Sequence, residues 1–242
     1  MAQGQTLMAG SPAGDCWLSQ RRELHFLCKR LLDLAIAVPA LLFLAPVLVF
    51  IGLLIMIDSK GSPIFAQTRA GSKRRRAGAG DLWEITPFTI YKFRTMYQNC
   101  DQSLHQAFIK SFAAGDVDAG SDQGAEFKLN DDPRITRAGH FLRRASLDEL
   151  PQLLNVVKGD MSLVGPRPVP EYEAEYYTGE QIERLYAVPG ITGLWQVQGR
   201  SQVTFAEMAR MDIAYARNQS LWLDLKILML TIPSVFTGSG AR

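Results

Sequence analysis

The chain has 242 residues, enough for one or two domains with a sizeable hydrophobic core. Its hydrophobic fraction of 47%, charged fraction of 21% and mean hydropathy of −0.01 exclude a disordered chain and a polytopic membrane protein. The formal net charge of +2 conceals an uneven distribution, because residues 34–57 carry no charge whereas five positive charges fall within residues 69–76. Three widely spaced cysteines in no CxxC pattern predict a reducing compartment without a disulfide or zinc framework.

The sequence divides into three predicted parts. Residues 1–20 are small and polar, which predicts a flexible N-terminal tail. Residues 21–57 combine an amphipathic lead with the uncharged segment, and they predict a membrane helix. Residues 58–242 predict a domain outside the membrane. It begins with two strands, IFAQTR and one ending in FTIYKFRTM, which a basic loop separates, and it continues with helices and loops.

The uncharged segment, residues 34–57, is long enough to span a bilayer, for which about 20 apolar residues suffice. Two prolines within it, Pro39 and Pro46, each remove a backbone donor and favour a kink. Basic residues flank the segment on both sides, and by the positive-inside rule both ends then lie on the cytoplasmic side. A re-entrant helix that bends at Pro46 fits all three features. A single spanning helix that tolerates its prolines is the alternative.

A second apolar stretch lies near the C-terminus, in residues 220–236. It carries two charges at its start and is too short to span a membrane. Trp222 is a candidate interfacial anchor. The stretch therefore predicts either a helix in the membrane plane or a helix of the protein core.

The segment from residue 143 to residue 170 contains adjacent carboxylates, Asp148 and Glu149, at the start of a helical pattern. One interpretation is a helix cap, because Ser146 to Glu149 fits a capping box, although Pro151 then falls where a backbone donor is needed. The other is a reactive site, since nearby arginines keep a carboxylate ionised and attract phosphate. These arginines are Arg143, Arg144 and Arg167.

Arg167 stands between two prolines, so its guanidinium loses little conformational freedom on binding a phosphate or a carboxylate. A structural ion pair is the alternative role. Further along, residues 188–205 contain glycines that are typical of turns or of close backbone approach. Gln196 and Arg200 in this segment are candidates to line a polar pocket.

Several other classes of site are not supported. The basic run Lys73–Arg76 lies close to the apolar segment without interleaved aromatic residues, which favours anionic lipid over nucleic acid as its contact. The three histidines are scattered and have no metal-ligand spacing. The sequence contains no GxGxxG, P-loop or GxSxG motif, so neither a dinucleotide site nor a serine nucleophile is predicted.

Taken together, these segments resemble the bacterial sugar transferase family, the monotopic polyprenyl-phosphate phosphoglycosyl transferases. The matching segments follow the family's order and cover most of residues 29–230. They are KRLLDLAIAVPALLFLAPV, SPIFAQTRAG, IYKFRTM, DPRITRAGHFLRRASLDELPQLLNVVKGDMSLVGPRPVP, PGITGLWQVQGRS and LDLKIL.

The resemblance implies an α+β protein of the bacterial inner membrane. Its expected parts are a re-entrant helix-break-helix hairpin and a mainly helical catalytic domain on the cytoplasmic face, with a short antiparallel strand pair and interfacial helices. The implied reaction moves a sugar-1-phosphate from a UDP-sugar to undecaprenyl phosphate and releases UMP. The likeness to small exopolysaccharide-initiating members implies UDP-galactose or UDP-glucose as donor.

The resemblance also assigns roles to single residues. Asp148 matches the family's nucleophile, which forms a covalent phosphosugar-aspartyl intermediate, and Glu149 matches the carboxylate that assists the Asp and Mg²⁺. Both carboxylates are therefore expected at the metal. The remaining matched positions are Arg143 and Arg167 near the phosphates, Lys29 and Arg30 at the lipid headgroups, and Pro46 at the helix break.

The sequence departs from the family pattern in three respects: Ala45 replaces a small polar residue, Pro39 is additional, and the stretches KRRRAGAGDLWEI (residues 73–85) and 98–130 are longer. The expected partners are a UDP-sugar, the polyprenyl phosphate and membrane lipids, with no nucleic acid. Association into a homo-oligomer is compatible with the sequence. Two other functions stay open, a membrane-anchored glycosyltransferase that releases UDP and a non-catalytic membrane adaptor whose carboxylates only cap a helix.

Overall fold

The computed structural model describes residues 6–8, 16–77, 80–98, 133–174, 177, 179–199 and 203–236. The stretch 98–130, apart from its first residue, and Arg200 therefore lie outside the described residues. The elements, in chain order, are β1 (Thr6–Met8), α1 (Cys16–Asp58), β2 (Ile64–Ala77), β3 (Gly80–Phe93), α3 (Arg137–Arg144), η1 (Leu147–Glu149), α4 (Gln152–Lys158), β4 (Ser162–Val164), β5 (Val169–Pro170), α5 (Glu171–Ala174), η2 (Gly179–Leu185), β6 (Gly190–Thr192), α6 (Leu194–Gln198), α7 (Phe205–Arg217) and α8 (Leu221–Phe236).

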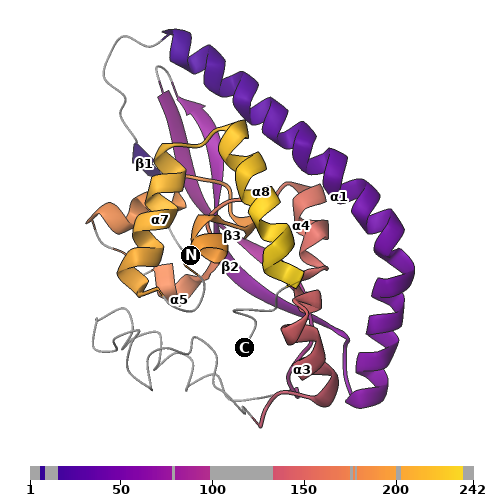
Figure 1. Ribbon diagram of the computed structural model, residues 1–242. Coiled ribbons are helices and arrows are strands. Elements are labelled where there is room, and N and C mark those ends of the chain that lie inside the picture. The colour runs from indigo at the N-terminus through magenta and orange to yellow at the C-terminus, as the bar shows by residue number, and fades with distance from the viewer. Residues whose placement is uncertain are drawn as a thin grey trace.

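A long antiparallel hairpin, β2 and β3, runs through the middle of the molecule (Figure 1). It pairs from Ile64 opposite Phe93 to Ala77 opposite Gly80, and β1 and β5 extend it to a sheet of order β1-β3-β2-β5. The antiparallel strand pair predicted from the sequence is thus present but is longer than expected. The mixture of helices and strands agrees with the α+β prediction.

The basic run 73–76, predicted as a loop, is part of strand β2. Side chains alternate between the two faces of a strand, so neighbouring arginines reach different surroundings. Arg74 stacks on the ring of Phe26, 4.0 Å from its centroid, and pairs with Glu23, both on α1. The side chain of Arg75 is 68% exposed and pairs with Glu84 across the hairpin. This alternation lets a charged segment continue the strand.

Helix α1 lies along one side of the molecule and bends along its length (Figure 1). Its 43 residues correspond to a length of about 64 Å at 1.5 Å per residue. The predicted break at Pro46 is absent, because α1 continues through Pro39 and Pro46, and the re-entrant hairpin is not confirmed. A proline withholds one N–H from a long helix and bends it without having to end it. The helix also begins at Cys16, within the segment predicted as a tail.

Among the described residues, α1 contains the one helical segment apolar and long enough to cross a membrane, Glu23–Asp58, with a mean hydropathy of 3.0 in its most apolar window. Only 11% of that window is buried within the protein. A core helix of a water-soluble domain would be mostly buried. The composition and exposure of α1 therefore indicate association with a membrane.

The main core lies between α1, the hairpin and the helices α4 and α8. Ile90 of β3, Val156 of α4 and Ile227 of α8 meet there with Ala37 of α1. The buried amide of Asn155 holds α4 to the edge of β3, since its Oδ1 accepts from the Tyr91 N–H at 3.1 Å and its Nδ2 donates to the Thr89 carbonyl at 2.6 Å. These contacts place the start of α4 beside the end of the hairpin.

Candidate active site

The two adjacent carboxylates lie in η1, a single 3-10 turn between α3 and α4. Ser146 precedes this turn in the left-handed region, with φ 55°, and its side chain makes no capping hydrogen bond. Helix α4 begins only after Pro151, where a missing N–H leaves no helical bond unmade. The capping box predicted at Ser146 is therefore absent, although both carboxylates lie in the first turn of η1. Asp148 and Glu149 are both half-buried in a turn that the chain enters through a strained residue.

Glu149 binds cations from two different parts of the chain. Its Oε1 lies 2.9 Å from Lys92 Nζ and 3.4 Å from an Arg167 guanidinium nitrogen. Lys92 comes from the end of β3, and burial lowers the pKa of its ammonium while the Glu149 carboxylate opposes that shift. The ion pairs join the carboxylate turn to the proline-flanked arginine that the sequence singled out.

Close backbone contact fixes the segment that carries Arg167. Gly165 donates its N–H to Thr192 O at 2.9 Å, and Gly190 donates to Pro166 O at 2.8 Å. A Cβ atom on Gly165 would lie 2.2 Å from the Val188 carbonyl oxygen, so a side chain there would push the two segments apart. The predicted close approach at Gly190 is confirmed in the same way, at 2.1 Å from the Gly165 nitrogen.

Helix α1 holds the strand that leads into this segment. Asp33 Oδ1 accepts from the Leu163 N–H at 2.9 Å and from the Ser162 hydroxyl at 3.0 Å. Lys29, one helical turn earlier, donates to the Val164 carbonyl at 2.9 Å. The membrane helix is thereby bonded to the backbone three residues before Arg167.

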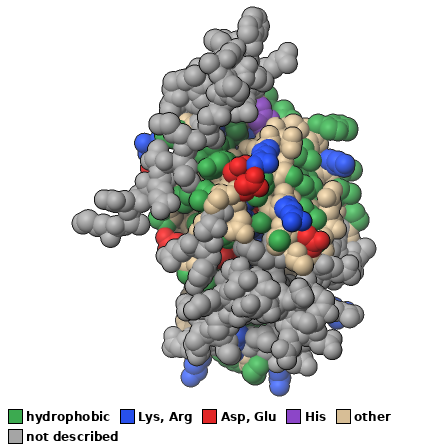
Figure 2. Space-filling model, turned by 90° about the vertical axis from the view of Figure 1, so that its left-hand side faces the viewer, with side chains coloured by type: hydrophobic (Ala, Val, Ile, Leu, Met, Phe, Trp, Pro, Cys, Tyr) green, Lys and Arg blue, Asp and Glu red, His purple; other side chains and the backbone are tan. Residues whose placement is uncertain are grey.

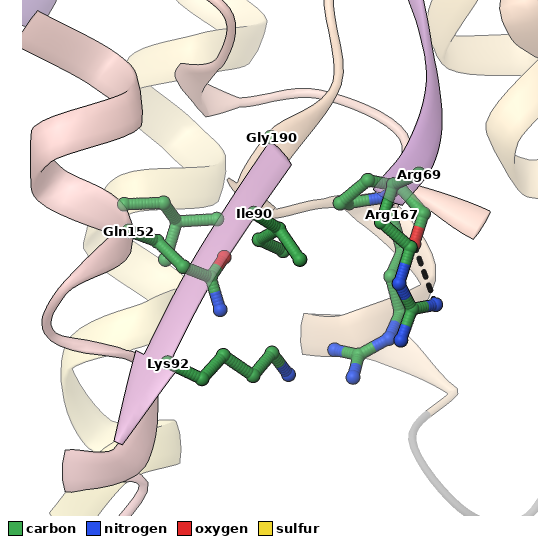
Figure 3. Close-up of a pocket in the computed structure, with 8 residues that line it drawn as sticks. Arg69, Ile90, Lys92, Gln152, Arg167 and Gly190 are labelled. Carbon is green, nitrogen blue, oxygen red and sulfur yellow. Dashed lines mark hydrogen bonds between the residues drawn. The ribbon is translucent and has the colours of Figure 1, made fainter. Parts of the chain in front are cut away.

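A small, open hollow lies beside the carboxylate turn, lined by Arg69, Lys92, Gln152 and Arg167 among other residues. Figure 3 shows Lys92 and Gln152 pointing into it from one side and Arg69 and Arg167 from the other. Its floor includes Ile90 and Gly190. Three cations around one small space, with polar hydrogen-bond donors, suit a ligand that carries several negative oxygens.

Arg69 and Lys92 were not among the residues predicted from the sequence. The register pairs Arg69 with Phe88 and Lys92 with Phe65, and cross-strand partners lie on the same face of a sheet. Since alternate residues along β3 also share a face, Arg69 and Lys92 both lie on the face of Ile90. A sequence analysis that had predicted the register of the β2–β3 hairpin would have shown that Arg69 and Lys92 lie on the same face.

Lys29 was predicted at lipid headgroups, and the structure places it inside the protein. The residue is 6% exposed, and its ammonium bonds Asp224 Oδ2 at 2.9 Å as well as Val164 O and the Tyr215 hydroxyl. Arg30 is half-buried and donates to the carbonyls of Val156 and Val157 near the end of α4. An ammonium with three oxygen partners has no donor left for a headgroup.

The other predicted residues lie at varying distances from the hollow. Arg143 lies in the last turn of α3, five residues before Asp148. Gln196 donates to the carbonyl of Ile191, which lines the hollow, and its own Oε1 is buried without a hydrogen bond to the described part of the chain. Pro46 is exposed on α1. Their predicted roles stay predictions.

A metal would have to be held by few protein ligands. Within the described parts of the chain, no three His, Cys, Asp or Glu side chains gather at one point. Mg²⁺ in phosphate chemistry is commonly held by one or two carboxylates together with phosphate oxygens and water. The pair Asp148 and Glu149 beside a cationic hollow fits that donor set.

Comparisons with known proteins find similar sequences over nearly the whole chain. A family described as Bacterial sugar transferase matches residues 24–238. The chain is 41% identical over 220 residues to the galactosyl transferase CpsE of Streptococcus agalactiae, which is 90% of this chain and 44% of that protein. It is 40% identical over 220 residues to the exopolysaccharide production protein ExoY of Sinorhizobium fredii, covering 91% of this chain and 90% of that protein.

A third similar protein is the UDP-glucose:undecaprenyl-phosphate glucose-1-phosphate transferase of Caulobacter vibrioides. It is 41% identical over 221 residues, which cover 88% of this chain and 71% of that protein. The chain spans less than half the length of CpsE and most of the length of the other two.

Proposed function

The chain belongs to the bacterial sugar transferase family, and we propose that it moves a sugar-1-phosphate from a UDP-sugar to undecaprenyl phosphate with release of UMP. The observation that carries the proposal is the meeting of Glu149 with Lys92 and Arg167 beside a cationic hollow. Phosphoryl transfer depends on positioning and on neutralising phosphate charge, and this arrangement supplies cations next to two carboxylates.

In the proposed first step a carboxylate oxygen of Asp148 attacks the β-phosphorus of the UDP-sugar. The new P–O bond to Asp148 forms while the bond between the β-phosphorus and the bridging oxygen breaks, and UMP leaves with that oxygen. In the second step an oxygen of the lipid phosphate attacks the same phosphorus and releases the Asp148 carboxylate. The product is a polyprenyl diphosphate sugar. Carboxylates are established nucleophiles in phosphoryl chemistry.

Glu149 is proposed to assist this chemistry from a fixed position. Lys92 and Arg167 bind its Oε1, so its carboxylate cannot swing away from the hollow. Arg167 is proposed to bind a phosphate, and Arg143 to act near the phosphates. Mg²⁺, held by Asp148 and Glu149, would neutralise phosphate charge during transfer.

The donor sugar is proposed to be galactose or glucose. The names of two relatives support this choice, a galactosyl transferase and a UDP-glucose:undecaprenyl-phosphate glucose-1-phosphate transferase. The likeness to ExoY along nearly the full length of both chains supports initiation of an exopolysaccharide as the biological role.

The protein is proposed to lie on the cytoplasmic face of the inner membrane with both ends of the apolar segment of α1, residues 34–57, on that face. Support comes from the way one folded body contacts α1 at both ends of this segment. Asp33 bonds Leu163 near one end, and Asp58 Oδ2 accepts from the Ala138 N–H at 3.0 Å at the other. A helix that crossed the bilayer would separate these two contacts by the hydrocarbon core, about 30 Å thick. A shallow path that enters and leaves one leaflet keeps them together.

The test is to identify the nucleotide released when purified protein, Mg²⁺ and undecaprenyl phosphate are mixed with a panel of UDP-sugars. UMP that appears with one sugar, and at steady state only with lipid, establishes the proposed reaction and names the donor. Release of UDP instead would show glycosyl transfer without the phosphate and would remove Asp148 from its role. No release with any donor would favour the adaptor function.

A further inference from the structure

The guanidinium of Arg69 lies in the wall of the hollow without an ion-pair partner among the described residues. It donates to the Gln67 side-chain oxygen at 2.7 Å and more weakly to the Pro168 carbonyl at 3.4 Å. Its Nε is buried and makes no hydrogen bond to any residue that the structure describes. A half-buried guanidinium with a buried, unmet donor is costly unless an anion completes it.

The nearest carboxylates are already bound to other groups. Glu149 pairs with Lys92 and Arg167. Glu173, behind the hollow, accepts from the Tyr177 hydroxyl at 2.6 Å and lies 3.9 Å from Arg184. A structural salt bridge therefore does not account for Arg69.

Arg167 lies against Arg69 as a second cation. Burial and the charge of Arg167 lower the pKa of Arg69 to about 10. Two like charges held next to each other in the wall of the hollow repel each other, and a bound dianion removes that repulsion. Figure 3 shows the two guanidinium groups next to each other and directed at the open space, opposite Lys92.

We propose that Arg69 is a substrate-binding residue that, together with Arg167, binds the oxygens of one phosphate group. The proposal rests on the proposed function, because it takes the phosphate to belong to the sugar nucleotide or to the polyprenyl phosphate. The planar guanidinium presents paired N–H donors that match two phosphate oxygens, which a lysine ammonium cannot reproduce. Lys92 and Arg167 lie at the same hollow, and Arg69 adds a third cation to it from strand β2.

Equilibrium binding of UMP and of pyrophosphate to the full-length protein, without turnover, tests this proposal. Arg69→Gln is expected to weaken binding about tenfold or more, since it removes charge-assisted bonds to phosphate. Arg69→Lys keeps the charge and is expected to restore only part of the affinity. Arg210→Gln removes an exposed arginine on α7 and serves as the matched control, with affinity unchanged. Unfolding temperatures of all variants show whether they are folded.

The source of the phosphate is decided by the rate of UMP release as each substrate is varied. A weaker UMP affinity together with a higher KM for the UDP-sugar assigns Arg69 to the nucleotide. Unchanged UMP affinity with a higher KM for undecaprenyl phosphate assigns it to the lipid. Folded Arg69→Gln and Arg69→Lys proteins with wild-type affinities and KM values would overturn the proposal. If the wild-type protein binds UMP but releases UDP, the proposed reaction fails while the role of Arg69 in binding phosphate stands.

Discussion

Asp148 and Glu149 are neighbours in one turn, yet the structure gives Glu149 two cationic partners from distant segments. We expect Asp148→Asn to reduce UMP release below detection, because an amide cannot attack the phosphorus. The unfolding temperature should stay close to that of the wild type, since Asp148 is half-buried in a turn. Steady-state UMP release by the purified variant is the measurement.

Glu180→Gln is the matched control for this substitution. Glu180 is exposed, and its nearest ion-pair contact is Arg217 at 4.0 Å, so the change should leave activity intact. Substantial turnover by folded Asp148→Asn protein would remove Asp148 from the role of nucleophile.

Lys92 gives the reaction a predicted pH dependence. Burial lowers the pKa of its ammonium below the ordinary value of 10.5, and Glu149 opposes that shift. As the pH rises through the lowered pKa, Lys92 loses its proton and Glu149 loses a cationic partner. We expect kcat/KM to fall on the alkaline side, at a pH below 10.5, in a pH–rate profile. The guanidinium introduced by Lys92→Arg stays charged, so a profile with the same alkaline fall in that variant would contradict the assignment.

The sequence indicated only part of the set of cations that lies beside the two carboxylates. Asp148, Glu149 and Arg167 lie in one recognisable segment, and the structure brings Glu149 and Arg167 together. Arg69 and Lys92 are single cations on strands, and only the register of the hairpin shows that they share a face. Their roles depend on pairing between residues far apart in sequence, which residue patterns do not determine.

At the scale of elements, Lys29 connects α1 to α8 through a buried ion pair with Asp224. We expect Lys29→Met to lower the free energy of unfolding by about 3–5 kcal/mol, because it leaves a carboxylate buried without its cation. Chemical denaturation in detergent measures this change. Lys226→Met, on the exposed side of α8, is the matched control and should have little effect.

A double variant separates this explanation from a simple packing defect. Lys29→Met combined with Asp224→Leu removes both charges, so most of the lost stability should return. If the double variant is as unstable as the sum of the two single variants, the ion pair is not the cause. The sequence could not predict this pair, since its members are 195 residues apart and Lys29 stands where the family resemblance implies a headgroup contact.

The buried cluster behind the hollow holds α5, η2 and α7 together. Arg184 of η2 bonds Asp212 of α7 at 2.7 Å and the Tyr177 hydroxyl at 2.6 Å. Arg184→Met should therefore lower the free energy of unfolding by about 3–5 kcal/mol, since Asp212 and Glu173 lose their cation. Arg217→Met is the matched control, because its pair with Glu183 is exposed and is worth at most about 1 kcal/mol. Equal losses in the two variants, measured by denaturation, would contradict this role for Arg184.

At the scale of elements the sequence also predicted the strand pair and the apolar helix. Its predictions of a basic loop and of a helix break at Pro46 differ from the structure, because contacts with distant parts of the chain act on both segments. The basic run continues strand β2 because Arg74 stacks on the ring of Phe26 on α1, a residue that lies far away in sequence. The break at Pro46 was inferred from the prolines, from the basic residues on both flanks and from the family resemblance. In the structure the rest of α1 stays helical on both sides of it.

At the scale of the whole molecule, the two sides differ in character. Figure 2 shows the side opposite α1, where basic and acidic side chains lie next to one another. Among the described residues, Arg217 of α7 pairs with Glu183 of η2, with 2.7 Å between nitrogen and oxygen. Along α1 large apolar side chains are exposed instead, among them Phe43 at 81% and Ile57 at 87%. A membrane therefore fits against α1 and an aqueous phase against the opposite side.

Both ends of α1 should be accessible from the same side of the membrane, and single cysteines test this. Leu24→Cys and Lys60→Cys, each in a chain whose native cysteines are replaced by serine, place thiols near the two ends of the apolar segment. Arg210→Cys reports the side of the folded body. A membrane-impermeant maleimide should label all three in inside-out vesicles and none in sealed vesicles of the opposite orientation. The physical reason is that Asp33 and Asp58 both bond the same body, which cannot lie on two sides of a bilayer. Labelling of residues 24 and 60 from opposite sides would mean that α1 spans the membrane and that one of these contacts is broken there.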